Sequence, residues 1–277
     1  MQNKPPIYTI EAGQPEIHYW RDIWSYRELF YFLAWRDILV RYKQTIIGLL
    51  WVLLKPILST VALIFVFSRI ANLPSGGEPY SILVLTAMLP WQFFSNAFIG
   101  AGESLISNSN MISKVYFPRL IIPFSAVIVS FFDFFITALV LISLMIFLSY
   151  IPTYRIFFMP FFVLMVFIAS LGFGFWASAL NVKYRDFRIV IPFVVQFGLY
   201  VTPVGFSSNL IPQQWRLLYS LNPMVGVIDG FRWSISNQYD QQLYLPGFLI
   251  SWLVILIVFI TGLAYFRKTE KFFADII

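Results

Sequence analysis

The stretch IIPFSAVIVSFFDFFITALVLISLMIFLS, residues 121–149, decides the fold class of this chain. Asp133 is its single charged residue, and nearly all of its other side chains are apolar. A helix of about 20 apolar residues is long enough to cross the hydrocarbon core of a bilayer. The stretch exceeds that length, so it predicts a membrane-spanning helix that tilts or projects beyond the bilayer.

Five further apolar stretches surround it and predict an all-α integral membrane protein with six transmembrane helices. They lie at about 46–68, 80–101, 156–180, 189–206 and 247–266. The span 189–206 is short and contains two prolines, so a broken helix is expected there. Charged residues interrupt the apolar pieces of 207–246, which therefore predict an outer re-entrant or interfacial segment.

The composition leaves little room for enzymatic machinery. Hydrophobic residues make up 59% of the 277 residues and charged residues 12%, against about 25% charged residues in a typical soluble domain. The chain has no cysteine, one histidine (His18) and no GxxxxGKS or GxxxxGKT phosphate loop. Thiolate catalysis, histidine triads, HExxH zinc sites and P-loop binding of ATP are therefore excluded. We expect a protein that is not an enzyme and holds no metal or cofactor of its own.

Basic residues are distributed unequally between the two sides of the predicted spans. Fourteen lie in the N-terminal segment, the connections 102–120 and 181–188 and the C-terminal segment, against four on the other side. Cytoplasmic loops are enriched in Lys and Arg. We therefore expect a multi-pass protein of a bacterial cytoplasmic (inner) membrane, with both termini in the cytoplasm. Because the basic residues flank the spans and form no patch, no nucleic-acid partner is expected.

A helix over 26–43 is predicted to lie in the membrane interface. Its aromatic and aliphatic residues share one helical stripe flanked by basic residues, which is typical of interfacial helices. The stripe comprises Tyr31, Phe32, Trp35, Ile38, Leu39 and Tyr42. The helix either only anchors the chain or forms a collar that also contacts a cytoplasmic partner. Residues 1–25 are predicted to be a cytoplasmic tail, and 26–277 the transmembrane domain.

Two ionisable residues, Lys55 and Asp133, fall within predicted spans. A charge at membrane depth must face protein or water, so each is a functional hypothesis. Asp133 either pairs with a polar neighbour in the bundle, with Lys55 joining it or reaching the interface, or serves ion-coupled transport. The spans contain no histidine and no second acid, which favours the structural role.

The connection between the second and third spans carries the most specific local signal. It reads GESLISNSNMISKVYFPRLIIP, residues 102–123, and changes from polar residues to a short amphipathic element. A solvated loop needs no such apolar residues, so the element is expected to dock on a partner or on the membrane surface. The candidate docking residues are Asn108, Met111, Ile112, Lys114, Val115, Tyr116, Phe117 and Arg119.

A second cytoplasmic loop, 181–188, is compact and charged. Its residues Lys183, Arg185 and Asp186 act either as simple topology signals or as a second docking contact.

Aromatic residues make up 20% of the chain, and most are expected in packing or in interfacial belts. Sugar rings present apolar C–H faces that stack on aromatic rings, so an aromatic-lined path would suit a long glycan. The residues that could line such a path are Trp91, Phe93, Phe94, Tyr200, Phe206 and Trp215.

Six segments in order resemble the transmembrane permease subunit of type-2 ATP-binding-cassette exporters. The resemblance is to the branch that exports polysaccharides and polyol phosphates, such as O-antigen, capsule and teichoic acid, and it covers nearly the whole chain from about Arg27. It is carried by RDILVRYKQTIIGLLWVLLKP (36–56), LPWQFFSNAF (89–98), SNSNMISKVYFPRLIIP (107–123), VKYRDF (182–187), TPVGF (202–206) and LNPM (221–224).

This resemblance implies a homodimeric permease that binds two copies of a separate cytoplasmic ATPase, which would hold ATP and Mg²⁺. In such exporters a short cytoplasmic helix between the second and third spans fits a groove on the ATPase. Here that helix maps to about Asn108–Arg119, with 207–246 as the outer re-entrant cap. The implied cargo is a lipid-linked polysaccharide.

Two other functions stay open on the sequence. One is an exporter of the same class that carries a lipid or a drug. The other is an ion-coupled secondary carrier that uses Asp133 and needs no ATPase.

Overall fold

The computed structural model describes residues 17–43, 46–238 and 242–273, and every regular element in these ranges is helical. The fold class predicted from the sequence, all-α, is confirmed for this part of the chain. The elements are α1 (Ile17–Ser25), α2 (Arg27–Lys43), α3 (Ile46–Ile64) with its π-helical continuation η1 (Phe65–Ile70), α4 (Tyr80–Ser107), α5 (Ser109–Ile112), α6 (Ile121–Phe147), η2 (Tyr154–Phe158), α7 (Met159–Lys183), α8 (Phe187–Val201), η3 (Ser208–Leu210), α9 (Gln213–Tyr219), α10 (Pro223–Ile235), α11 (Leu245–Thr269) and η4 (Glu270–Phe272).

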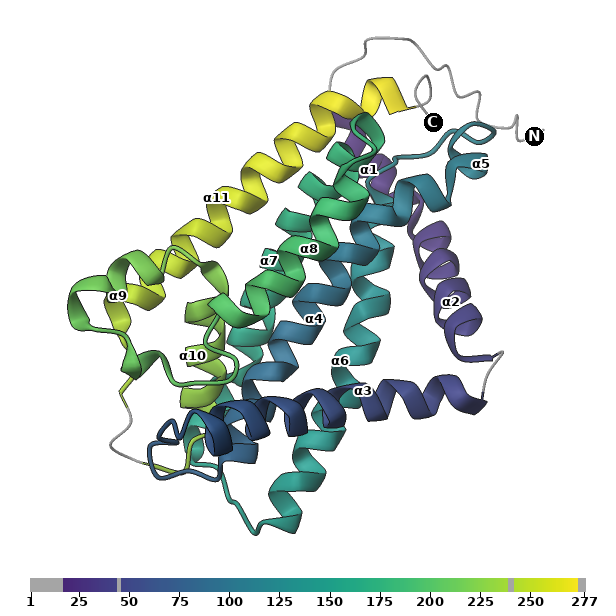
Figure 1. The fold of residues 1–277 in the computed structure, drawn as a ribbon. Helices are drawn as coiled ribbons and strands as arrows, with labels where there is room; N and C mark the ends of the chain where they lie inside the picture. The colour runs from purple at the N-terminus through teal and green to yellow at the C-terminus, as the bar shows by residue number, and fades with distance from the viewer. Residues whose placement is uncertain (1–16, 44–45, 239–241, 274–277) are drawn as a thin grey trace.

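The helix α4 forms the centre of the bundle (Figure 1). It packs along α6 and along α7, and α7 in turn packs along α11. In the most apolar window of α4, 78% of the residues are buried, against 39% in α6 and 22% in α11. The outer helices therefore keep broad apolar faces that only lipid or another subunit can cover.

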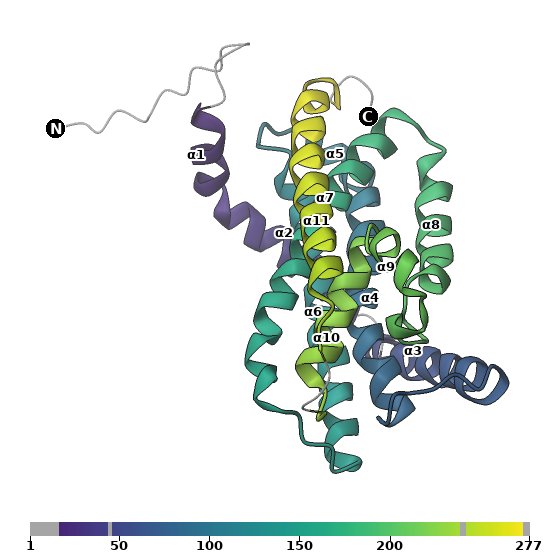
Figure 2. The same cartoon turned by 90° about the vertical axis from the view of Figure 1, so that its left-hand side faces the viewer.

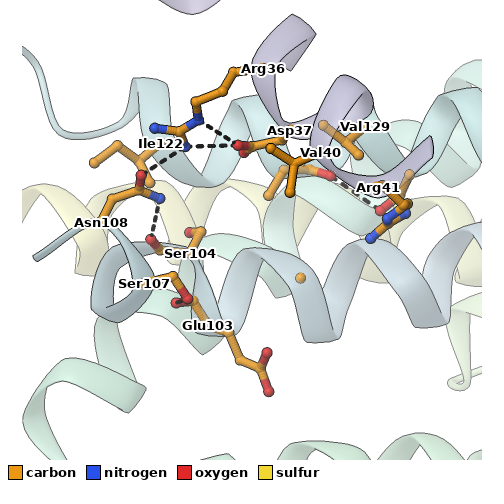
Figure 3. Close-up of a pocket in the computed structure, with 13 residues that line it drawn as sticks. Arg36, Asp37, Val40, Arg41, Glu103, Ser104, Ser107, Asn108, Ile122 and Val129 are labelled. Atoms are coloured by element: carbon orange, nitrogen blue, oxygen red, sulfur yellow. Dashed lines mark hydrogen bonds and ion pairs between the residues drawn. The ribbon is translucent and has the colours of Figure 1, made fainter. Parts of the chain in front are cut away.

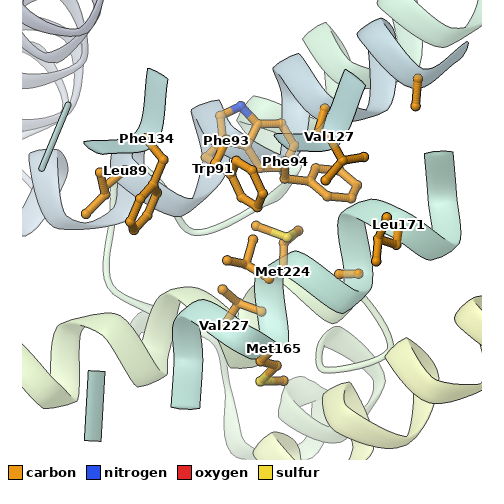
Figure 4. Packing of buried hydrophobic residues seen from close by; sticks show 14 of the residues in the cluster. Leu89, Trp91, Phe93, Phe94, Val127, Phe134, Met165, Leu171, Met224 and Val227 are labelled. Atoms are coloured by element: carbon orange, nitrogen blue, oxygen red, sulfur yellow. The ribbon is translucent and has the colours of Figure 1, made fainter. Parts of the chain in front are cut away.

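Aromatic rings fill the space between α4, α6 and α7. Phe93 of α4 is 1% exposed, and its ring centroid lies 5.4 Å from that of Phe131 and 5.8 Å from that of Phe134. A third ring, Phe167 of α7, stacks on it at 6.3 Å. Figure 4 shows Phe93 and Phe134 in this cluster. Such ring pairs stabilise a fold by about 0.5–1.5 kcal/mol each beyond the burial of their area.

Within the described ranges, five helical stretches are long and apolar enough to cross a membrane. They are Leu53–Ile70, Tyr80–Ser107, Ile121–Phe147, Tyr154–Lys183 and Leu245–Phe272. They match the first, second, third, fourth and sixth predicted spans, so the multi-pass character of the chain agrees with its sequence.

The fifth predicted span, 189–206, is represented by α8, which has only 15 residues. At about 1.5 Å per residue it is shorter than the hydrocarbon core. Pro203 explains where it ends, because the residue before a proline is disfavoured in helical conformation. Thr202 is accordingly extended. The predicted count of six spans is therefore not confirmed by helix length.

The first two long helices lie differently from their predicted orientation. In Figure 1, α3 runs across the lower part of the bundle and not along it, whereas α2 runs beside α6. The sequence predicts a span at 46–68 and an in-plane helix at 26–43. Charge pairing accounts for the position of α2, because Arg36 binds Asn108 and Arg41 binds Asp133.

The connections gather at two ends of the bundle. In Figures 1 and 2, α5, the turn between α7 and α8 and the C-terminal end of α11 lie at the upper end. The connections 71–79 and 148–153 lie at the opposite end. The upper end, which we call the basic end, thus brings together the segments that the sequence places on one side of the membrane.

Arg232 of α10 fastens the irregular segment that follows α8. Its guanidinium donates to the backbone carbonyl oxygens of Val204 at 3.0 Å, Phe206 at 2.8 Å and Leu83 at 3.3 Å. Buried carbonyl groups outside a helix need such donors. One buried arginine therefore ties α10, α4 and 202–206 together.

A carboxylate joins the connections at the opposite end. Glu78 accepts hydrogen bonds from the phenol of Tyr150 at 3.0 Å and from the hydroxyl of Ser236. Burial and the neighbouring Glu78 raise the pKa of the Tyr150 phenol, so its hydroxyl remains a donor at neutral pH. The cluster closes the end of the bundle remote from the basic end.

Two glycines allow α7 and α11 to approach closely. A Cβ atom on Gly262 would lie 2.5 Å from the carbonyl oxygen of Gly172, and one on Gly172 would lie 2.8 Å from the backbone of Phe259. Small residues at such crossings are a common means of helix association in membranes.

We therefore expect Gly262→Ala to lower the stability of the purified protein by about 1–3 kcal/mol, the usual range for overpacking. Thermal unfolding in mild detergent would measure the change. Gly100→Ala is the matched control, because a Cβ there meets nothing within 4 Å. Equal midpoints for the two variants would contradict the close approach of α7 and α11.

Candidate functional site

The predicted docking element, the loop 108–119 between α4 and α6, lies at the basic end (Figure 1). Its only helix is the single turn α5, after which the amides of Lys114 and Val115 still bond to the carbonyl of Met111. Pro118 has no N–H to continue a helix and disfavours helical conformation at the residue before it. The loop is therefore one short helical turn followed by irregular chain. It differs in this from the resemblance, which implies a helix over about Asn108–Arg119.

The structure divides the predicted docking residues by exposure. Val115 is 56% exposed and Tyr116 66% exposed, and Lys114 is exposed beside them. By contrast, Ile112 is 5% and Phe117 4% exposed. Lys114–Tyr116, which we call the tip, therefore faces outward between two buried anchors. Met111, Asn108 and Arg119 are half-buried.

The first end of the loop is held by α2. The guanidinium of Arg36 donates to the side-chain oxygen of Asn108 at 2.9 Å, and the amide of Asn108 donates to the Ser104 carbonyl at 2.9 Å. Arg36 also pairs with Asp37 at 2.7 Å. Figure 3 shows these side chains converging where α4 ends. The start of the loop is thus fixed to both α4 and α2.

The second end of the loop is held by the C-terminal end of α11. The backbone N–H of Arg119 donates to a carboxylate oxygen of Glu270 at 2.9 Å, and its guanidinium donates to the Glu270 carbonyl. Tyr19 of α1 donates to the same carboxylate at 3.0 Å. Burial and the neighbouring carboxylate raise the pKa of the Tyr19 phenol, so the hydroxyl keeps its proton at neutral pH.

A cavity of about 420 Å³ lies beside Asn108, between α2, α4 and α6 (Figure 3). Arg36 and Arg41 line it together with Asp37 and Glu103. Because charges of both signs face it, the cavity favours no anion or cation and suits polar groups or water. Among the described residues, no three His, Cys, Asp or Glu side chains form a group that could hold a metal ion.

The second predicted contact lies at the same end. Lys183, Arg185 and Asp186 are all exposed in the turn between α7 and α8. The ammonium group of Lys183 lies 5.0 Å from the ring centroid of Tyr184. Figure 1 places this turn and α5 at one end of the bundle, so both are accessible from that side.

The predicted stripe of α2 faces away from the bundle. Tyr31, Phe32, Trp35 and Leu39 are exposed and Ile38 is half-buried, while the side chain of Tyr42 lies outside the described part. The opposite face, Leu33 and Ala34, is buried against the bundle. The stripe is therefore available to lipid or to a partner.

Asp133 of α6 has a charged partner in the bundle. The Arg41 guanidinium lies 2.6 Å from its carboxylate, and the amide of Asn96 donates to it at 3.5 Å. Lys55 is exposed on α3. This arrangement supports the structural interpretation of Asp133, in which a neighbour neutralises the charge.

The residues predicted for a glycan path separate into two groups. Trp91, Phe93 and Phe94 are buried among the core helices. Tyr200 of α8 and Trp215 of α9 are exposed, and Phe206 is half-buried with its ring 5.9 Å from that of Phe67. Only Tyr200 and Trp215 offer most of their surface to a substrate or a second subunit.

Sequence reasoning missed the residues that position the loop. From the sequence, Arg36 and Arg41 count only among the basic residues that set the membrane topology, and Glu270 has no expected role. The sequence does contain a signal for Arg36 and Arg41. Both lie off the apolar stripe of α2, and a charged side chain that faces the bundle needs a partner there. No local sequence pattern predicts the role of Glu270, because its partner Arg119 is 151 residues away in the chain.

Comparison with known proteins gives one family and several relatives. Residues 28–236 match the family described as ABC-2 type transporter. The chain is 27% identical over 248 residues to an O-antigen export system permease protein RfbA of Klebsiella pneumoniae, covering 87% of this chain and 92% of that protein. It is 26% identical over 217 residues to a protein of the same description from Myxococcus xanthus, covering 76% and 82% of the two chains.

We expect Asp133→Asn to destabilise the protein by roughly 1–2 kcal/mol, between the values for exposed and buried ion pairs. The variant leaves Arg41 without its carboxylate partner, and Arg41 is partly exposed. Adding Arg41→Gln is expected to cause little further loss, because the pair is already broken. Thermal unfolding in detergent would measure both, with Glu103→Gln on exposed α4 surface as the control. Strictly additive losses would contradict the coupling.

Proposed function

Because this chain belongs to the ABC-2 type transporter family, we propose that it is the permease subunit of an ATP-driven exporter of a lipid-linked polysaccharide. The family match covers most of the chain. The relatives from two organisms that align with most of it are described as O-antigen export permeases. These similarities support a glycan cargo over a drug or a simple lipid.

Export of the polymer would be driven by two copies of a separate cytoplasmic ATPase, which would bind ATP and Mg²⁺. The observation that carries this proposal is the tip Lys114–Tyr116. Its side chains are exposed, whereas Ile112 and Phe117 on either side are buried and the ends of the loop, Asn108 and Arg119, are hydrogen-bonded within the subunit. Tyrosine is enriched among the residues that contribute most to protein interfaces, and docking would remove the apolar surface of Val115 and Tyr116 from water. The exposed turn Lys183–Asp186 at the same end would be a second contact.

In this proposal the protein crosses the inner membrane six times, with both termini in the cytoplasm. The short helix α8 and residues 202–206 would make the fifth crossing, between those of α7 and α11. The positive-inside rule supports this, because it puts both termini in the cytoplasm and two termini on one side need an even number of crossings. The exposed stripe of α2 would face lipid or the ATPase, and the segment containing α9 and α10 would be the outer re-entrant cap.

Two copies of the chain would form the translocation path. The exposed apolar face of α8, with Phe193, Phe197 and Tyr200, needs cover from lipid or from a second subunit. Together with Trp215, Tyr200 would offer stacking surface to a passing glycan.

An ion-coupled carrier is the competing function, and the geometry around Asp133 weighs against it. The carboxylate of Asp133 lies 2.6 Å from the Arg41 guanidinium, so it already has a charged partner within the bundle, whereas a carrier would need it free to bind the coupling ion. No observation among the described residues favours the carrier.

The test is recovery of the ATPase with the tagged chain from its native cell in mild detergent. We expect a cassette ATPase to co-purify in equal amounts, and Lys114→Glu or Tyr116→Ala to reduce its recovery at least about tenfold, equivalent to about 1.4 kcal/mol. Arg69→Glu makes the same charge change on exposed surface away from the basic end and serves as the control.

A different result would overturn the proposal. If the chain purifies without an ATPase, transports in liposomes under an ion gradient and loses transport on Asp133→Asn, the carrier is correct.

A further inference from the structure

We propose that Glu270 is a positioning residue that joins the loop 108–119 to α11, so that the loop and this helix move as one body during transport. The inference rests on the proposed function, since it concerns how motion of the docked loop is passed on. Glu270 lies outside residues 28–236, the part of the chain that matches the family model.

Glu270 holds the end of the loop through two different groups. Its carboxylate accepts the backbone N–H of Arg119 at 2.9 Å, and its own carbonyl accepts the Arg119 guanidinium. The first bond depends on no side chain of the loop. The carboxylate therefore positions the main chain directly after Phe117 and Pro118, which are both buried.

The same carboxylate binds two more side chains from other segments. The phenol of Tyr19 donates to both of its oxygens at 3.0 Å, and Arg267 binds one of them at 3.0 Å. The guanidinium of Arg267 lies 3.3 Å from the ring centroid of Tyr19. The side chains of Arg267 and Glu270 are 20% and 12% exposed, so the cluster is largely shielded from water. Hydrogen bonds to an ionised group are the strong ones, and shielding from solvent reduces their screening.

The helix that Glu270 ends can carry motion across the molecule. Through the glycine contact described above, α11 packs closely on α7, and Trp176 stacks on Tyr265 at 4.5 Å. Its other end contacts α9 and α10. A displacement of the loop would therefore reach the α9–α10 segment through one helix of 25 residues.

The two ends of the loop are attached differently. Asn108 is bound by Arg36 of α2, whereas Arg119 is bound by Glu270 and through it by Tyr19 of α1. Neither attachment involves the exposed tip. A substitution at Glu270 should therefore change how motion of the loop reaches α11, while leaving intact the tip that docks the ATPase.

Glu270→Gln in the complete complex tests the inference. The variant keeps the size of the side chain but removes the charge that binds Arg267 and Tyr19. We expect the ATPase to co-purify as with the wild type, ATP hydrolysis to stay within about twofold, and polymer exported per ATP to fall at least about fivefold. Glu28→Gln, an exposed carboxylate on α2, is the matched control.

A distance measurement keeps the test informative if the variant is less stable. The chain has no cysteine, so spin labels attach to it only at Asn110→Cys and Lys271→Cys, both at exposed positions. Complexes assembled with a small fraction of labelled chain then report the distance within one subunit. We expect one unchanged distance between the nucleotide-free and nucleotide-trapped complexes of the otherwise wild-type chain. In Glu270→Gln we expect a second, nucleotide-dependent distance.

Three outcomes would overturn the inference. Export per ATP equal to the wild type would show that Glu270 has no role in coupling. A proportional loss of hydrolysis and export together with a lower melting temperature would show that it only stabilises the fold. A nucleotide-dependent distance in the wild type would show that the loop and α11 move apart. Failure of the wild-type chain to recover an ATPase would instead contradict the proposed function.

Discussion

Charged side chains can lie inside this bundle only where a partner neutralises them or accepts their hydrogen bonds, and the structure depends on that constraint. Leaving one such group unpaired in a low-dielectric interior costs several kcal/mol. Arg41 reaches Asp133 at 2.6 Å, and the donors of Arg232 are used by three backbone carbonyls. These pairings fix the positions of α2 beside α6 and of α10 against 202–206. Apolar packing alone would leave both positions undetermined.

The same constraint explains which features could be predicted from the sequence. The length of an apolar stretch is a local property. The spans predicted from it at 80–101, 121–149, 156–180 and 247–266 each coincide with a long helix to within a few residues or lie within a longer one. Pro203 ends α8 early, also for a local reason. The partner of Asp133 lies 92 residues away and that of Glu270 lies 151 residues away. No periodicity specifies such pairs, because they arise only when the helices pack.

Exposure adds a distinction that residue type cannot supply. In the sequence, Tyr116 and Phe117 are neighbouring aromatic residues of one amphipathic element. In the structure Tyr116 is 66% and Phe117 4% exposed. Truncation of Phe117 would open a cavity as well as alter a surface, so its effect on a partner could not be separated from its effect on the fold. Tyr116 carries no such ambiguity.

The loop 108–119 thus separates shape from recognition. Its shape is set by Asn108, Ile112, Phe117 and Arg119, whose contacts lie within the subunit. In the proposed exporter, recognition would be left to the tip Lys114–Tyr116, whose side chains make no hydrogen bond among those described within the subunit. Such a chain could change the chemistry of its docking surface while the ends of the loop keep their geometry. The exposed tip and the largely buried carboxylate of Glu270 would then be two parts of one coupling device. The tip would contact the ATPase, and Glu270 would connect that contact to the bundle.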